Sequence, residues 1–378
     1  MTNGHLPADV KRTSVLRRVP SLAEVRFRSE CGEEGDVCAF ELPIDAFPVT
    51  VEAPTGRVMA IVPGDVFLAT PGHRQSTKWV DGKIPAGGLT PGGHYWVLAE
   101  CGLVGELVGN SPSEKDHLGR VKYVGKVYGK GGWDLNIRQF AVPGPAGPNR
   151  NMAVYLVLGT SGDSGKTTAG LAVLRTLRMQ GHAIVTALKA TGTPSLEEIS
   201  RYRDFGAAQA FDCVDFGLPA TDPLGRDGIS EAFDRMLDYC LSLPADALVV
   251  ECGGDLFGAN VPAFLKCLRL RRPDPKIVLA ATDALGALGA TRVLSDMGLA
   301  ISLITGPCTD TPTFRERTEA LCSVPAINLL RRAGESDLTS DSVLIPAIPG
   351  SIGSSSRHLR GDQVASRDRI GRRPKRSA

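Results

Sequence analysis

The sequence predicts an α/β fold in which a doubly wound, mostly parallel sheet is preceded by a small β-rich domain. Three observations support this prediction. In the second half of the chain, short apolar runs alternate with longer segments of helical periodicity, as strands do when helices cover both faces of their sheet. A glycine-rich turn joins the first of these runs to the first helical segment. In the first half, short apolar runs are separated by Gly and Pro turns, which is typical of a compact β domain.

Composition divides the first half of the chain into three parts. Residues 1–34 are polar and charged, and they are interpreted as an N-terminal extension. Residues 35–141 contain apolar runs such as 58–62 and 95–99, with turn residues between them. Short strands at this spacing predict a small barrel or sandwich. The stretch 142–151 is rich in Pro and Gly, which is typical of an extended linker.

The second domain is predicted over residues 152–333. Its expected strands are nearly all apolar and cover 153–158, 183–188, 247–251, 276–281 and 300–304. A helix is expected over 166–180, with Gly181 at its end because glycine adopts the left-handed backbone of a helix terminus without strain. Residues 334–378 lose apolar content and gather Arg and Lys. We therefore expect a disordered basic tail there, with contact to nucleic acid or acidic lipid as the less favoured alternative.

Composition also narrows the class of function. A length of 378 residues allows two domains plus tails. With 42% hydrophobic and 22% charged residues, the chain has the composition of a soluble globular protein. A net charge of +2 creates no overall field that favours nucleic acid. The nine cysteines form no C-x-x-C pair, which is typical of reduced thiols. With no signal peptide and no apolar run of membrane-spanning length, we expect a cytoplasmic protein without membrane contact.

The segment from Gly159 to Thr168, with the sequence GTSGDSGKTT, carries the strongest functional signal. It lies between a predicted strand and a predicted helix, and this order forms a phosphate-binding loop because backbone amides and the positive helix end face phosphate oxygens. Lys166 is expected to reach the β- and γ-phosphates, and the Thr167 hydroxyl to ligate Mg²⁺. The residues predicted to bind the nucleotide are Gly162, Asp163, Ser164, Gly165, Lys166, Thr167 and Thr168. The sequence therefore predicts a P-loop nucleotide site.

Charged residues and glycines follow the next strands of the predicted sheet. In doubly wound sheets, chemistry collects at the carboxyl ends of the strands. Lys189 directly follows the second expected strand, where an ammonium would neutralise charge during phosphoryl transfer. Glu251 ends the third, where a phosphate-bound Mg²⁺ needs an oxygen ligand. Gly253 and Gly254 allow a substrate to approach the backbone, and Asp255 is either a second carboxylate ligand or a turn residue.

The loop differs from the usual P-loop pattern by one residue, because five residues instead of four separate Gly159 from Gly165. This form resembles the P-loop of dethiobiotin synthetase and of the ATP-dependent cobyrinic acid a,c-diamide synthases. The resemblance covers about residues 150–330. It implies ATP and Mg²⁺ as cofactors. These enzymes place an asparagine against the purine where this chain has Gly306-Pro307-Cys308, so ATP is implied by the resemblance alone and GTP is not excluded.

The resemblance also implies roles for residues beyond the P-loop. The lysine at the position of Lys189 helps to bind the substrate and the transferring phosphoryl group, and the hydroxyl residue after it corresponds to Thr191 or Thr193. The magnesium-binding glutamate of the Val-Glu-Gly-x-Gly-Gly-Leu element corresponds to Glu251. Here Cys252 replaces a glycine of that element. The glycines that follow, Gly253 and Gly254, correspond to the part of this element where the backbone approaches the substrate.

A third metal ligand in these enzymes is an aspartate about fifteen residues beyond the lysine. Asp204 lies at that distance. The nearby alternatives are Asp212, Asp215 and Asp222. Glu197 and Glu198 follow Pro194-Ser195 and are interpreted as residues of a first helical turn, where the helix dipole alone explains them.

The leading hypothesis is an ATP- and Mg²⁺-dependent ligase or phosphotransferase that activates a carboxylate-type group of a small molecule, with Lys166 and Lys189 as catalytic residues. A regulatory or assembly P-loop NTPase, acting on a protein or cofactor partner and forming a homodimer, is the first alternative. An acyltransferase that uses the loop for the phosphates of coenzyme A is the second. The identity of the substrate and the role of the β-rich domain stay open at this point.

Overall fold

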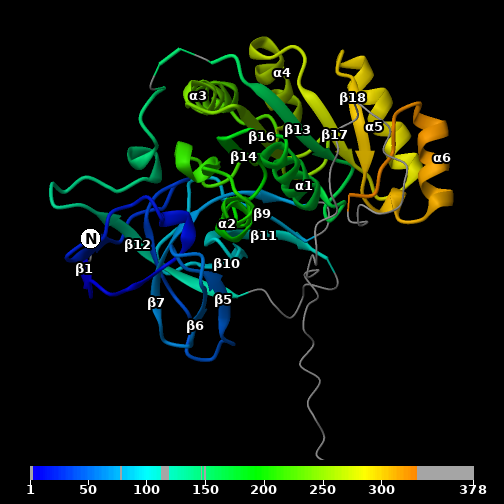
Figure 1. The fold of residues 1–378 in the computed structure, drawn as a ribbon. Helices are drawn as coiled ribbons and strands as arrows, with labels where there is room; N and C mark the ends of the chain where they lie inside the picture. Colours follow the sequence, from blue (N-terminus) through cyan, green and yellow to red (C-terminus); the bar gives the residue numbers. More distant parts are fainter. Residues whose placement is uncertain (1–2, 77–78, 112–118, 146, 149, 330–378) are drawn as a thin grey trace, which may run out of the picture.

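The computed structural model describes residues 3–329, apart from residues 77–78, 112–118, 146 and 149. The basic tail expected over 334–378 lies outside the described residues. Within the described part, a β-rich unit that is blue to cyan in Figure 1 lies against an α/β unit that is green to orange, and each unit is built on one main sheet. None of the described helices combines the length and apolar character needed to cross a membrane.

The β-rich unit is built on a mixed sheet of ten described strands, whose main path runs in the order β1-β3-β12-β4-β7-β11-β9-β8. Strand β10 pairs with β11 and β12, and β2 pairs with β7. The strands are β1 (Asn3–Leu6), β2 (Lys11–Arg12), β3 (Val25–Arg28), β4 (Cys38–Glu41), β7 (Val66–Pro71), β8 (Arg74–Gln75), β9 (Val80–Lys83), β10 (His94–Ala99), β11 (Leu103–Asn110) and β12 (Arg120–Tyr128). A separate hairpin contains β5 (Val49–Glu52) and β6 (Val58–Ile61), and the short 3-10 helices are η1 (Ser14–Leu16) and η3 (Ile137–Phe140).

This sheet begins earlier in the chain than the composition suggested. The polar segment that we interpreted as an N-terminal extension contributes β1, β2 and β3 to the sheet. Val25 is buried, whereas its neighbours in β3 are partly or fully exposed. Strand β3 has one buried residue, and β2 and the described part of β1 have none, which gives too weak an alternation for these short strands to be recognised from sequence.

The α/β unit confirms the predicted fold class. Its six-stranded sheet has the order β15-β14-β16-β13-β17-β18, and all of its recorded pairings are parallel. The strands are β13 (Ala153–Gly159), β14 (Val185–Thr191), β15 (Gln209–Asp212), β16 (Ala247–Cys252), β17 (Lys276–Ala280) and β18 (Ile301–Thr305). The helices are α1 (Lys166–Met179), α2 (Leu196–Asp204), α3 (Ile229–Ser242), α4 (Val261–Arg271), α5 (Ala284–Asp296) and α6 (Pro312–Cys322), with short 3-10 helices η4 (Cys213–Phe216) and η5 (Pro307–Thr309).

Helices cover both faces of this sheet, as its apolar strands require. Successive side chains of a strand point to opposite faces, so Tyr155 and Val157 pack with residues of α1 and α2, whereas Leu156 and Leu158 pack with residues of α3, α4 and α5. The apolar core that contains Leu156 and Leu158 continues into the β-rich unit, where it includes Leu16 among other buried residues. The two units therefore share one apolar core, and Figure 1 shows them in direct contact.

A buried carboxylate at the contact between the two units has an unusual environment. Asp222 is 2% exposed, and its Oδ1 atom has no hydrogen-bond partner among the described residues. Burial raises the pKa of Asp222 to about 6, against the opposing effects of the Gln75 backbone and of the Arg74 and Arg226 charges. The folded state therefore binds this proton more tightly than the unfolded state, whose pKa is near 3.8. The stability that the protonated group contributes is lost as the pH rises through 6.

Asp222→Asn is therefore expected to stabilise the protein above pH 6. The gain in the free energy of unfolding at pH 8 should be about 3 kcal/mol at most, because each pKa unit corresponds to about 1.4 kcal/mol. Near pH 4 most of the difference between variant and wild type should disappear. Urea unfolding at both pH values measures it, with the exposed Asp274→Asn as a control. Equal effects of Asp222→Asn at pH 4 and pH 8 would contradict this explanation.

Candidate nucleotide-binding site

The predicted phosphate-binding loop joins β13 to α1 at the centre of the parallel sheet. Strand β13 ends at Gly159, and α1 begins at Lys166. Asp163 and Gly165 have positive φ angles of 55° and 94°, in the left-handed region. Residues in this conformation turn successive amide groups toward one side and create an anion-binding concavity in front of the helix N-terminus. The strand, the loop and the helix start lie where the sequence predicts them.

Lys166 is folded over this loop. Its side chain is 7% exposed, and Nζ donates a hydrogen bond to the Ser161 carbonyl oxygen at 2.6 Å. A Cβ atom on Gly159 would lie 2.6 Å from Cδ of Lys166 and 2.5 Å from Oγ of Ser164, so the loop needs glycine at this position. Burial lowers the pKa of Lys166, and the nearby Glu251 charge opposes that effect. A phosphate in the loop would offer the ammonium an anionic acceptor in place of the carbonyl, and such bonds are roughly twice as strong.

Glu251 connects the loop to the rest of the site. It is 2% exposed, and its Oε1 accepts a hydrogen bond from the Thr167 hydroxyl at 2.9 Å. Its Oε2 accepts one from the Tyr202 hydroxyl at 2.8 Å. Burial, and then the Glu198 charge, raise the pKa of Glu251, while Lys189 and the two hydroxyl donors lower it. The carboxylate is thus held in place by two hydroxyl groups. The positive charge near it, from Lys189, does not fully offset the effects of burial and of the Glu198 charge.

Lys189 lies beside Glu251 in the sheet. The two residues are in register between β14 and β16, and Lys189 forms an ion pair with Glu198 of α2. Burial alone would lower the pKa of Lys189, but the Glu198 and Glu251 carboxylates raise it above the ordinary value. The ammonium therefore stays charged. Lys189 lies within β14 and not beyond its end as predicted, because the strand continues to Thr191.

Two residues of this cluster were missed or misinterpreted in the sequence. Tyr202 gave no signal of its own, because an aromatic residue in a helix is usually core. Glu198 occupies the first turn of α2 as expected, but the helix dipole alone does not explain it, since its carboxylate pairs with Lys189. Gly170 was the one residue that could have pointed to Tyr202. Glycine within a helix lowers its stability by about 1 kcal/mol relative to alanine, so a glycine there indicates that a neighbouring group packs closely against the helix.

Gly170→Ala is expected to disrupt the Tyr202–Glu251 contact. A Cβ atom on Gly170 would lie 1.9 Å from the Tyr202 hydroxyl oxygen, so the tyrosine must move. The variant should lose about 1–3 kcal/mol of unfolding free energy, as is usual for overpacking, despite the better helix propensity of alanine. Gly289→Ala in α5 is the matched control, because a Cβ there meets nothing within 4 Å, and it should be neutral or stabilising. Equal unfolding free energies for the two variants in urea would contradict the prediction.

The β-rich unit fixes the start of α2. The Glu52 carboxylate accepts hydrogen bonds from the backbone amides of Leu196 at 3.0 Å and Glu197 at 2.7 Å, and also from the Ser14 hydroxyl. A carboxylate at a helix N-terminus is favoured by the helix dipole and satisfies amides that have no partner within the helix. The position of Glu198, and with it the ion pair to Lys189, therefore depends on a residue about 140 positions earlier in the chain.

The structure does not bring Asp204 to this cluster. Asp204 is the exposed last residue of α2, whereas the contacts of α2 with the site come from Glu198 and Tyr202. Asp204 lies at the C-terminal end of α2, two residues beyond Tyr202, and not at the site as predicted. Of the alternatives, Asp212 and Asp215 form ion pairs with Arg17 at 2.6 Å each, and Asp222 lies at the contact with the β-rich unit beside Gln75.

The residues predicted on the substrate side form part of the loop structure. The Thr191 hydroxyl donates to the Gly253 carbonyl oxygen at 2.9 Å, and the Gly253 amide donates to the Thr191 carbonyl oxygen at 3.1 Å, so these two residues tie their loops together. Thr193 is half-buried and Gly254 is exposed. Asp255 is a turn residue, because its Oδ1 accepts from two backbone amides within the same loop at 2.8 Å.

The other side of the loop is closed by the ends of β17 and β18. A Cβ atom on Gly306 would lie 2.6 Å from the Ser164 carbonyl oxygen, and its φ of 96° is in the left-handed region. The Thr160 hydroxyl accepts a hydrogen bond from the Thr282 amide at 3.3 Å. Glycine at 306 therefore allows the backbone to approach the P-loop closely.

The donor set at Thr167 and Glu251 fits a magnesium ion. Both groups offer hard oxygen ligands, and Mg²⁺ is usually held by one or two protein oxygens together with substrate phosphates. Among the described residues, no group of three or more His, Cys, Asp and Glu could hold a metal by itself. Burial and the Glu198 charge raise the pKa of Glu251, so additional positive charge beside its carboxylate would stabilise the ionised form. A divalent cation shared with phosphate oxygens would supply that charge.

Comparisons with known proteins identify no family. No protein-family model and no curated protein matches the chain. Similar solved structures include the signal recognition particle 54 kDa protein from Aeropyrum pernix K1 in complex with GDP, with 17% identity and a TM-score of 0.34 over 48% of this chain and 42% of that one. Chloroplast FtsY from Physcomitrella patens has 12% identity and a TM-score of 0.34 over 50% of this chain and 62% of its own.

The receptor FtsY from Elizabethkingia anophelis in complex with GDP is similar at 13% identity and a TM-score of 0.33, over 50% of this chain and 60% of its own. The chain thus spans less than two thirds of each of these three proteins. The assignment of the site depends on its own geometry.

Proposed function

We propose that the α/β unit binds a nucleoside triphosphate with Mg²⁺ and transfers its γ-phosphoryl group to a carboxylate-type oxygen of a small molecule, as a ligase or phosphotransferase. One observation carries this proposal: the P-loop lysine, a second charged lysine and a hydroxyl–carboxylate pair are gathered at the carboxyl ends of three adjacent strands. Lys166, Lys189, Thr167 and Glu251 form this cluster. A cradle that supplies two ammonium groups and metal ligands beside a phosphate loop is suited to phosphoryl transfer.

The two lysines would act on charge that develops during the reaction. Lys166 would exchange the Ser161 carbonyl for the β- and γ-phosphates. Lys189, held charged by its carboxylate neighbours, would face the transferring group and the acceptor. Electrostatic stabilisation by groups that are already oriented costs no reorganisation during the reaction. The buried positions of both ammonium groups strengthen their interaction with phosphate, because water screens them poorly there.

Thr167 and Glu251 would hold Mg²⁺. The ion, when bound, neutralises negative charge on the phosphates. Tyr202 is a positioning residue: burial and then the Glu251 charge raise its pKa, which keeps the hydroxyl protonated, so that it donates to Glu251. The carboxylate can therefore rotate little and presents its Oε1 oxygen to the Thr167 side of the site.

The acceptor would approach from the loops that follow β14 and β16. In the reaction, an acceptor carboxylate oxygen attacks the γ-phosphorus, the bond to the bridging oxygen breaks, and the nucleoside diphosphate leaves. An amine can then attack the acyl phosphate and expel phosphate. Thr193 and Gly254 are accessible on this side. The similarity of the P-loop and of the Glu251 element to dethiobiotin synthetase and the cobyrinic acid synthases supports this substrate class and supports ATP, with GTP as the alternative nucleotide.

Two measurements test the proposed function. Thermal shift with ATP, GTP and coenzyme A, each with Mg²⁺, identifies the bound ligand because a ligand that binds only the folded state raises its stability. Release of nucleoside diphosphate is then followed with a panel of small carboxylates, with and without an amine. Diphosphate release that depends on one carboxylate supports the proposal. Hydrolysis that is indifferent to every carboxylate would favour a regulatory or assembly NTPase, tested further as a nucleotide-dependent homodimer, and stabilisation by coenzyme A alone would favour an acyltransferase.

A further inference from the structure

Helix α2 presents two different faces to its surroundings. With about 100° of rotation per residue, Glu198 and Tyr202 lie on one side of the helix, and both contact the nucleotide site. Leu196, Ser200 and Arg203 form a stripe on the opposite side, and this stripe lines a cavity of about 320 Å³ between α2 and the β-rich unit. A helix of nine residues thus separates the nucleotide site from a second, distinct cavity.

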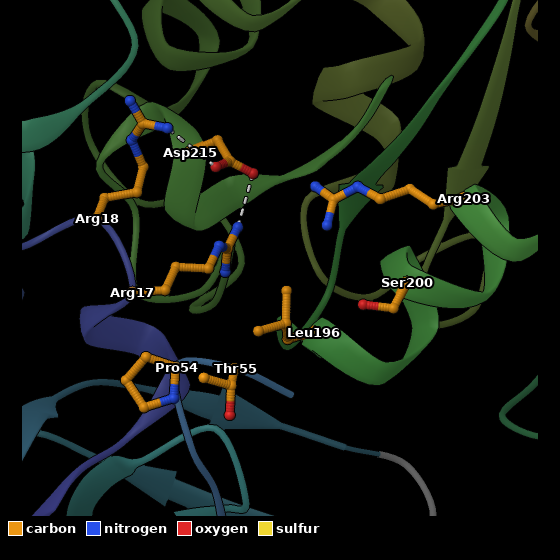
Figure 2. Close-up of a pocket in the computed structure, with 8 residues that line it drawn as sticks. All are labelled: Arg17, Arg18, Pro54, Thr55, Leu196, Ser200, Arg203 and Asp215. Atoms are coloured by element: carbon orange, nitrogen blue, oxygen red, sulfur yellow. Dashed lines mark hydrogen bonds and ion pairs between the residues drawn. The ribbon is translucent and has the colours of Figure 1, made fainter. Parts of the chain in front are cut away.

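The cavity lies between elements from three parts of the chain. Arg17 and Arg18 follow η1, Thr55 is in the turn between β5 and β6, and Asp215 belongs to η4. Figure 2 shows the Arg203 side chain extending from α2 toward Arg17 and Asp215. A second cavity of about 290 Å³ is also lined by Arg18 and Arg203. Both volumes are at the small end of the range for small-molecule sites, roughly 300–1,000 Å³.

The charges around this cavity favour an anion. Arg17 forms ion pairs with Asp212 and Asp215, and its Nη2 atom lies 2.6 Å from one carboxylate oxygen of each. Arg18 donates from Nε to the Phe140 carbonyl oxygen at 2.7 Å and lies 3.5 Å from Asp215. Arg203 donates from Nη2 to the Ala210 carbonyl oxygen at 2.8 Å. Three guanidinium groups and one carboxylate, that of Asp215, therefore line the cavity, and a guanidinium has five N–H donors arranged in a fork that matches a phosphate or carboxylate group.

We propose that this cavity is an effector site for a small, multiply charged oxyanion, such as a phosphate ester or a dicarboxylate, bound by Arg18 and Arg203 with the hydroxyl groups of Thr55 and Ser200. The bound anion would link α2 to the β-rich unit. It would thereby hold Glu198 against Lys189, on the opposite face of the same helix. The binding part of this inference stands without the proposed function, whereas the effect on turnover rests on it.

The binding test uses the full chain and inorganic phosphate or succinate as probes, followed by isothermal titration calorimetry. Phosphate is expected to bind at two sites, the P-loop and the cavity. Lys166→Ala should remove only the first, and the Arg18→Ala/Arg203→Ala double variant should weaken only the second, by at least tenfold. Arg235→Ala, which removes an exposed arginine of α3, is the control. Ser200→Asp adds a negative charge to the cavity without removing a recorded contact, and it should also weaken the second site.

These outcomes separate the two proposals. Loss of all anion binding in Lys166→Ala, or unchanged binding in both cavity variants, would overturn the effector site and leave the nucleotide site intact. Tighter binding of succinate than of phosphate at the cavity would identify a dicarboxylate as the ligand class, and the reverse order a phosphate ester. In turnover assays, the preferred anion should raise kcat at least twofold in the wild type and not in the double variant. Binding at the cavity with no change in kcat would overturn the effector role.

Discussion

Lys166→Ala is expected to weaken nucleoside triphosphate binding by about 10- to 100-fold and to leave the protein folded. The ammonium is buried and donates only to the Ser161 carbonyl oxygen among its recorded hydrogen bonds, so its removal deletes the group that can reach the β- and γ-phosphates. Hydrogen bonds to charged groups contribute about 1.5–3 kcal/mol each, which corresponds to this loss of affinity. Equilibrium titration with ATP and with GTP measures the effect.

Lys266→Ala provides the control for that change, because it removes an exposed lysine from α4, away from the loop. It should leave the affinity for nucleotide unchanged. The unfolding free energies of both variants should stay close to that of the wild type. Equal nucleotide affinity in Lys166→Ala and wild type would show that the loop is not the phosphate site.

Glu251→Gln should reduce turnover by about 10²-fold or more, the range found when one oriented electrostatic group is removed, while nucleotide affinity changes far less. Glutamine nearly preserves the shape and keeps one oxygen that can accept from Tyr202 or Thr167, but it removes the negative charge that would hold Mg²⁺. Turnover measured against Mg²⁺ concentration should show a higher requirement in the variant. Steady-state turnover and Mg²⁺ dependence near those of the wild type would exclude Glu251 as the metal ligand.

The same substitution should change the pH profile. Burial and the Glu198 charge raise the pKa of Glu251 above its ordinary value. At Mg²⁺ concentrations below saturation, turnover of the wild type should therefore fall as the pH decreases through that raised pKa, because a proton then competes with the ion for the carboxylate. Glu251→Gln has no proton to gain, so its low residual turnover should lack this acidic decline. A decline of the same shape in both proteins would assign the titration to another group.

The sequence was sufficient where a single local pattern fixes the structure. The apolar strand, the glycine-rich turn and the helix around Lys166 are contiguous, so their geometry follows from local backbone chemistry. Glu251 was expected beside the loop for a related reason, because the carboxyl ends of parallel strands meet at one edge of the sheet, whereas its role as a metal ligand stays a prediction. Its hydrogen bond to Thr167 confirms that the ends of β13 and β16 meet.

Residues whose roles depend on distant parts of the chain were not predicted. Glu198 and Tyr202 acquire their roles because Glu52, in another unit, fixes the start of α2, and nothing near Glu52 in sequence indicates a helix to cap. Asp204 was chosen by spacing along the chain, but an α-helix rotates about 100° per residue, so a residue two positions from Tyr202 lies on a different face. Strand β15, four residues long with alternating exposure, was missed because it is short and only half apolar.

Calorimetric titration of the wild-type protein with ATP and with GTP, each in the presence of Mg²⁺ and of EDTA, tests the central claim most directly. If Lys166, Thr167 and Glu251 form a magnesium–nucleotide site, one of the two triphosphates will bind at one site per chain. That binding will tighten with Mg²⁺, because the ion neutralises the negative charge of the phosphates, which would otherwise repel the buried Glu251 carboxylate. The absence of saturable binding for both nucleotides, or binding that Mg²⁺ does not affect, would contradict the account.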